Sequence, residues 1–204
     1  MGIVKKLTAK SWSAENSASD DQHLSAISPH SSKIGLRLFL AIVTSLFFLV
    51  VAAYKMRMDL ADWVPMPEPD LLWYNTVILI ASSLAMEWAR RAARRGQAQT
   101  VKLGMMIGGL LAITFLVGQL VAWQEMANLG FYASSNPANS FFYMITGIHG
   151  LHILGGVIAW TRSMARIGRG DDEDKIKLGV DLCATYWHFL LLVWLVMFAL
   201  MIST

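Results

Sequence analysis

Cysteine, proline and charge are scarce in this sequence, and each shortage excludes a class of protein. Cys183 is the only cysteine among 204 residues, which excludes an internal disulfide and an all-cysteine zinc site. Charged residues make up 15% of the chain, against about 25% in average soluble proteins, while 55% are hydrophobic. None of the five prolines falls inside a long apolar run, which argues against a transporter built from broken helices. The basic residues flank those runs and form no patch of their own, so nucleic-acid binding is not expected.

Five long apolar runs account for most of the chain. As helices, runs of about 19 or more residues can cross a hydrocarbon core of about 30 Å. They are too long and too continuously apolar for barrel strands, and in lipid only a helix or a closed barrel satisfies its own backbone. The sequence therefore predicts an all-α integral membrane bundle of five transmembrane helices within residues 33–204: Ile34–Tyr54, Leu71–Ala89, Val101–Met126, Ser140–Trp160 and Leu178–Ile202.

Residues 1–32 have a different composition from the runs that follow. They are polar and rich in serine, with lysines and acids mixed. Such a segment cannot bury enough apolar surface to fold alone, so we expect a disordered polar cytoplasmic tail. His23 and His30 lie in it and are expected to be solvated.

The distribution of lysine and arginine predicts the orientation in the membrane. Fifteen of the seventeen lie on one side: thirteen lie before the first run, between the second and third, or between the fourth and fifth, and Arg37 and Lys102 lie at the starts of the first and third runs. The opposite side has only Lys55 and Arg57. Basic loops stay in the cytoplasm, so we expect a cytoplasmic amino terminus and a carboxyl terminus outside.

Three histidines lie near the middle of apolar runs, where polar groups are costly and often functional. His149 and His152 are three residues apart and therefore share a helical face. With His188 they could ligate a metal or haem, or each imidazole could hydrogen-bond to a neighbouring helix. No cysteine, carboxylate or fourth histidine is placed to complete a site at that depth. The residues favour hydrogen bonding and predict no metal.

Other candidates are polar or small residues in or beside the runs. Arg90 and Arg91 fit a topology determinant, and alternatively a site for anionic lipid headgroups. Glycines let helix backbones approach closely in lipid, where apolar burial contributes little. We therefore expect helix packing at the G-x-x-x-G pair and at four glycines of the fourth run: Gly104, Gly108, Gly147, Gly150, Gly155 and Gly156.

Two motifs carry a resemblance to a known family. Residues 140–156, which include T-G-I-H-G-L-H, resemble a signature of subunit III of the haem–copper oxidases. Tyr186-Trp187-His188-Phe189, followed by Val193-Trp194, resembles the family's signature on its last helix. Gln119 with Trp123 resembles a third pattern, and Asp181 stands where the family often has an acid. The resemblance covers roughly residues 33–204 and is to the short, five-helix bacterial form.

The resemblance implies an accessory subunit III of a cytochrome c oxidase in a bacterial plasma membrane. Family members have no haem or copper of their own, pack against subunit I, hold phospholipids and support proton uptake, while partner subunits carry haem and copper. Subunit II and membrane lipids are further expected partners. A quinol oxidase or a nitric oxide reductase-associated homologue remains an alternative, and a haem-binding membrane cytochrome a more distant one. The expected structural and lipid-binding residues are His149, His152, His188, Gln119, Trp123, Trp187, Trp194, Glu125, Asp181, Arg90 and Arg91.

The chain departs from the family pattern at three acidic positions. Val43, Ala122 and Leu191 stand where the family often has intramembrane carboxylates. Their loss favours packing and lipid binding over a proton relay through this subunit's own acids. Glu125, three residues after Ala122, is a candidate replacement near the outer surface.

Overall fold

The computed structural model describes residues 29–64 and 70–203, with side chains from Ser31 onward. Most of the predicted tail, His23 among it, lies outside the described residues. All the regular structure that is described is helical, which confirms the all-α fold. The helices are α3 (Pro29–Met58), α4 (Leu71–Arg94), α5 (Ala98–Asn128), α6 (Pro137–Arg169) and α7 (Glu173–Ile202).

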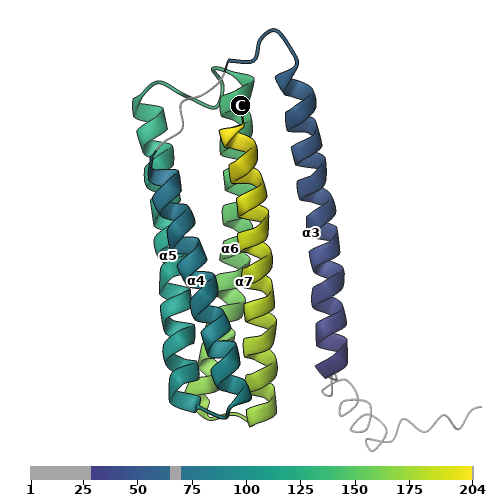
Figure 1. Ribbon diagram of the computed structural model, residues 1–204, viewed down its shortest axis with the longest axis vertical. Coiled ribbons are helices and arrows are strands. Elements are labelled where there is room, and N and C mark those ends of the chain that lie inside the picture. The colour runs from purple at the N-terminus through teal and green to yellow at the C-terminus, as the bar shows by residue number, and fades with distance from the viewer. Residues whose placement is uncertain (1–28, 65–69, 204) are drawn as a thin grey trace, which may run out of the picture. The chain divides into compact units, whose positions relative to one another are not determined.

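Helices α4 to α7 form a four-helix bundle joined by short connections (Figure 1). Helix α4 packs against α5 and α7, and α6 packs against the same two helices, so the four close into a ring. The chain divides into two compact units, Met1–Leu38 and Phe39–Thr204. Every contact described below lies within the second unit.

Most helix ends extend a few residues to more than two turns beyond the predicted spans, whereas α4 begins at Leu71 and α7 ends at Ile202 as predicted. Helix α6 extends furthest, and both of its ends are capped locally. Asn136 begins α6 by accepting a hydrogen bond from the Ala138 amide at 3.1 Å, and Pro137 fits the first helical position. Gly170 ends α6 in the left-handed conformation, with φ of 69°. In the last turn of α3, the Arg57 guanidinium donates to the carboxylate of Asp62, which follows the helix, and this bond lowers the pKa of that carboxyl.

Four of the five helices are long and apolar enough to cross a membrane: α3 from Ser31 on, α5, α6 and α7. Helix α4 is not among these four, although Leu71–Ala89 was predicted to span. Its mean hydropathy is reduced by polar residues, and Asn75, Thr76, Ser82 and Ser83 are all buried. Its large exposed residues are mostly apolar or aromatic, such as Val77. Helix α4 therefore points its polar side chains inward, as polar groups in membrane helices do.

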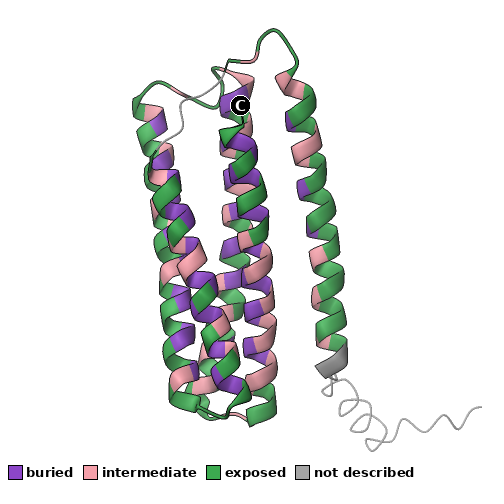
Figure 2. Cartoon of the chain, viewed as in Figure 1, coloured by how far each residue is buried: buried purple, intermediate pink, exposed green. Residues whose placement is uncertain are grey.

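Burial follows one face of each helix in the bundle (Figure 2). Trp187, Trp194 and Phe115 are among the largest fully buried side chains. Outward-facing positions carry leucine, isoleucine and valine, for example Leu120 and Leu151. An apolar surface of this extent is suited to lipid or to a membrane partner.

Candidate functional site

Indole groups join neighbouring helices through the bundle interior. Trp187 Nε1 donates to Ser82 Oγ at 2.9 Å, and Ser82 Oγ donates to the Gly108 carbonyl at 2.7 Å. This chain of hydrogen bonds crosses from α7 through α4 to α5. Trp194 Nε1 makes the second α7–α4 link, donating to Thr76 Oγ1 at 2.9 Å. The last-helix signature thus has its two tryptophans as cross-links inside the bundle.

Two further tryptophans join α5 to α6. Trp123 Nε1 donates to Thr146 Oγ1 at 2.9 Å, and Thr146 is the first residue of the T-G-I-H-G-L-H motif. Trp160 Nε1 donates to the Met105 carbonyl at 2.8 Å. The Trp160 ring lies over Gly109, where an added Cβ would come within 2.2 Å of the ring. Gly109 is therefore required by the ring, and the sequence analysis did not select it.

The six predicted packing glycines differ in their surroundings. A Cβ on Gly104 would lie 2.9 Å from the Ala89 Cβ, one on Gly108 2.9 Å from the Met86 Cε, and one on Gly156 2.9 Å from the Tyr186 ring. Gly147 and Gly150 have neighbours only at ordinary contact distances. Nothing lies within 4 Å of a Cβ on Gly155, so it does not contribute to packing between the described helices.

The three histidines do not converge on one point. His149 is fully buried, with its ring centroid 5.1 Å from Trp194 and 5.9 Å from Phe115. His152 lies beside the Ile148 carbonyl of its own helix, 2.8 Å from Nδ1, and is half-buried. His188 is six residues before Trp194, about 9 Å along the helix axis. This geometry does not fit a shared three-nitrogen metal site.

His188 belongs instead to a polar cluster on α4 and α7. Its Nδ1 lies 2.6 Å from Ser83 Oγ, and its Nε2 lies 3.2 Å from Glu87 Oε2. Arg91 Nε donates to Glu87 Oε1 at 3.0 Å, and Arg90 Nε lies 3.0 Å from Glu87 Oε2 without hydrogen-bond geometry. The Glu87 carboxylate thus faces three potential cations and is mostly buried. We call Ser83, His188, Glu87, Arg90 and Arg91 the Glu87 cluster.

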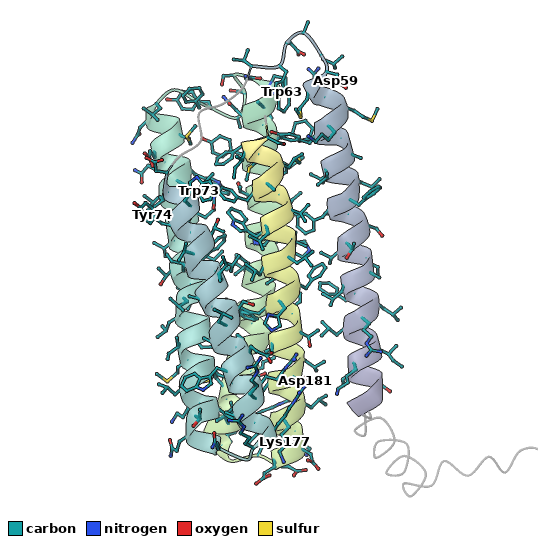
Figure 3. The ribbon with its side chains drawn as sticks, viewed as in Figure 1. Asp59, Trp63, Trp73, Tyr74, Lys177 and Asp181 are labelled. Atoms are coloured by element: carbon teal, nitrogen blue, oxygen red, sulfur yellow. The ribbon has the colours of Figure 1, made fainter. Side chains whose placement is uncertain are left out.

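The sequence analysis did not select Glu87 and had not paired it with His188. The i,i+3 and i,i+4 spacing to the arginines was visible in the sequence, whereas the contact with α7 was not. A second ion pair, Arg94 with Asp181 at 3.8 Å, joins the same two helices nearby. Figure 3 shows Asp181 and Lys177 at the end of the bundle opposite Trp73 and Tyr74.

Two of the cavities on the described part of the second unit have contrasting linings. One, of about 200 Å³, is a groove between α3 and α7, and we call it the α3–α7 groove. Its lining is almost wholly apolar: Thr44, Phe47, Phe48, Val51, Phe189, Leu192, Val193, Val196 and Met197.

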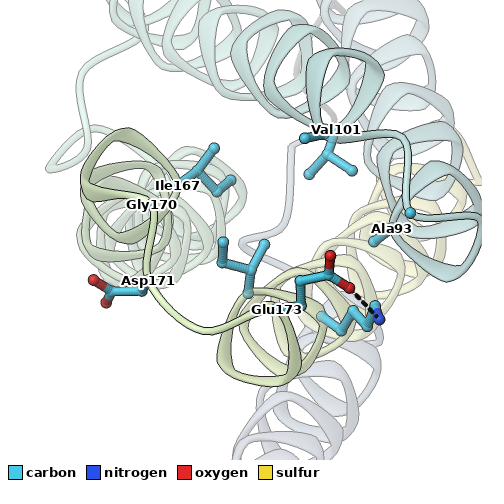
Figure 4. A pocket seen from close by; sticks show the side chains of 10 residues that line it. Ala93, Val101, Ile167, Gly170, Asp171 and Glu173 are labelled. Carbon is cyan, nitrogen blue, oxygen red and sulfur yellow. Dashed lines mark hydrogen bonds and ion pairs between the residues drawn. The ribbon is translucent and has the colours of Figure 1, made fainter.

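The second cavity, of about 240 Å³, lies where the α4–α5 and α6–α7 turns meet (Figure 4). Its apolar wall includes Ala93, Val101 and Ile167. The ion pair between Lys177 and Glu173, 2.9 Å long, lies at its rim. Because the one lysine is already paired, this cavity is poorly suited to a phosphate.

The three departures from the family pattern differ in exposure. Val43 and Ala122 are buried in the core, and Leu191 is half-buried. Glu125 lies on the exposed face of α5. It therefore does not occupy the interior position that Ala122 fills, and its role as a replacement acid near the outer surface stays a prediction.

Comparison with known proteins gives one consistent answer. A family model described as cytochrome c oxidase subunit III matches residues 13–203. A cytochrome c oxidase subunit 3 from Synechocystis sp. is 32% identical over 178 residues, covering 84% of this chain and 75% of the relative. A probable cytochrome c oxidase subunit 3 from Mycobacterium tuberculosis is 31% identical over 141 residues, covering 67% and 69%. One from Nocardia farcinica is 28% identical and covers 84% of this chain and 87% of the relative.

Proposed function

The chain belongs to the cytochrome c oxidase subunit III family, and we propose that it is the accessory subunit, without a redox centre of its own. It is a membrane protein and a subunit of a haem–copper oxidase, in complex with other oxidase subunits. Haem and copper reside in those partners in this proposal. The observation that supports it is the separate engagement of the three imidazoles, each of which has a ring or hydrogen-bond partner that the other two lack.

The test of this role is an optical spectrum. The chain, tagged and purified from its own membrane, is expected to bring with it a haem-bearing subunit I, and subunit II with it. After mild dissociation, the haem absorbance is expected to stay with the partners. A Soret band on the separated chain would overturn the accessory role, and co-purification without any haem protein would overturn the proposed partners.

Phospholipid binding is the second part of the proposal, and the α3–α7 groove supports it. A lining of valine, leucine and phenylalanine complements a hydrocarbon chain, and about 200 Å³ holds several methylene groups. Val196 is exposed along this groove. Val196→Phe would fill part of the space without adding charge.

The lipid experiment compares two valine substitutions. Val196→Phe is expected to lower the number of phospholipids that co-purify with the complex, counted by native mass spectrometry. Val117→Phe is the matched control, because Val117 is a similarly exposed valine on α5 outside the groove. An unchanged lipid count in Val196→Phe would refute lipid binding at the groove.

Orientation and the fifth crossing complete the topology we propose. Helix α4 pairs with α5 along its length, and its polar side chains are buried, which supports a crossing by α4 as well. The basic connections α4–α5 and α6–α7 then lie on the cytoplasmic side of the bacterial plasma membrane, and the carboxyl terminus lies on the outer side. Cysteine labelling from each side of intact cells, at Gln97 and Ser203, tests this arrangement.

Proton uptake is proposed to depend on this subunit only indirectly, through its association with subunit I and lipid. The burial of Val43 and Ala122 supports this, because neither apolar residue can transfer a proton. Cytochrome c is the electron donor that the relatives' names favour. Turnover by the purified complex with reduced cytochrome c, compared with quinol, separates the two donors.

A further inference from the structure

Two buried side-chain amides and one buried imidazole in the bundle interior have hydrogen-bonding atoms without a partner among the described residues. Asn75, Gln119 and His149 are only 1%, 3% and 0% exposed. Within the described residues, Asn75 Nδ2, both polar atoms of the Gln119 amide and both ring nitrogens of His149 find no hydrogen-bond partner. Inside a membrane protein such groups are expected to be satisfied, because lipid offers none.

Contacts between the helices place these groups in one layer of the bundle. The Trp194 ring lies 5.1 Å from His149, and its indole donates to Thr76, the residue after Asn75. The Phe115 ring lies 5.9 Å from His149, and Gln119 follows Phe115 by one turn of α5. A Cβ on Gly118 would lie 2.2 Å from Asn75 Oδ1, so Asn75 abuts α5 beside Gln119.

Residue pairs between α5 and α6 locate Gln119 opposite His149. The two helices are antiparallel, with Trp123 bonded to Thr146 at one level and Phe115 beside His149 at another. Gln119 lies midway between Trp123 and Phe115, and His149 is three residues from Thr146. The amide and the imidazole therefore lie within about one helical turn of each other. No direct hydrogen bond joins these two side chains, both of which are described.

From this layer we infer a bound water site, in which at least one water molecule bridges the Gln119 amide and the His149 imidazole. A water molecule donates two hydrogen bonds and accepts two, and buried waters typically make about three. The Gln119 amide offers donors and an acceptor, and a neutral imidazole offers one of each. Asn75 Nδ2 supplies a further donor from α4. The site takes a neutral hydrogen-bonding ligand, because the layer has no carboxylate or cation among the side chains that define it.

A density map of the intact oxidase complex, at a resolution that shows water, tests the site directly. The expected result is a spherical peak within about 3 Å of both a Gln119 amide atom and a His149 ring nitrogen. Direct bonding between the two side chains, an empty layer, or a larger ligand at this position would each overturn the inference.

Substitutions test the bridge energetically in the same complex. Gln119→Leu and His149→Leu are each expected to shorten the half-life of the complex at raised temperature at least about fivefold, because each leaves the water and its other partner under-bonded. The double variant is expected to be little worse than the poorer single variant, because both partners are then gone. Strictly multiplicative effects would show that the two residues act independently and would overturn the bridge. Gln124→Leu, an exposed glutamine on the same helix, is the control and is expected to leave the half-life unchanged.

Discussion

Gly109→Ala is the perturbation for which the structure gives the sharpest expectation. The new methyl group would lie 2.2 Å from Trp160 Cε2 and 2.3 Å from Cζ2. These are ring atoms, so no flexible chain end can move aside. The ring is also held by its hydrogen bond to the Met105 carbonyl at 2.8 Å. Either the bond breaks or α5 and α6 move apart.

The expected loss follows from three contributions. Overpacking a filled interior costs about 1–3 kcal/mol. Loss of the indole hydrogen bond costs about 1 kcal/mol more. Replacing glycine by alanine within a helix stabilises the helix by about 1 kcal/mol and offsets part of this loss. The net destabilisation is therefore about 1–3 kcal/mol.

Gly155→Ala is the matched control, because nothing lies within 4 Å of its added Cβ. It is expected to leave stability unchanged or slightly increased. The assay is the loss of this subunit from the purified complex on heating in detergent, followed by gel electrophoresis. If Gly109→Ala and Gly155→Ala dissociate at the same temperature, the packing between the Trp160 ring and α5 is not as described.

The other predictions concern polar contacts. Glu87→Gln removes the carboxylate shared by two arginines and His188, and should destabilise the complex by about 1–2 kcal/mol, with the difference from wild type shrinking at high salt; equal thermal stability at every salt concentration would contradict this. Trp187→Phe leaves Ser82 without its indole donor and should cost about 1–3 kcal/mol in the same heating assay, whereas an unaltered transition would show that the bond contributes nothing. Glu125→Gln should leave turnover rate and turnover lifetime unchanged, since Glu125 is exposed; a slower proton uptake in that variant would restore it as a functional acid.

The length of the apolar runs predicted the helices well, because long apolar segments in lipid have few alternatives. The positions of Gln119 and His149 in the interior agree with the cost of polar groups in lipid. Which side chains of different helices contact each other was harder to predict. Nothing in the spacing of Glu87 and His188, which are 101 residues apart, indicates that they meet. Gly109 was missed for the same reason, because its requirement comes from a ring on another helix.

Helix α4 has a consequence for biogenesis. Isolated in a bilayer, it would present Asn75, Ser82 and Ser83 to hydrocarbon, which makes independent insertion unfavourable. In the folded chain Ser82 finds the Gly108 carbonyl on the next helix to be synthesised. We therefore expect α4 to leave the translocon only when α5 has arrived beside it, so that the two enter the lipid as a hairpin.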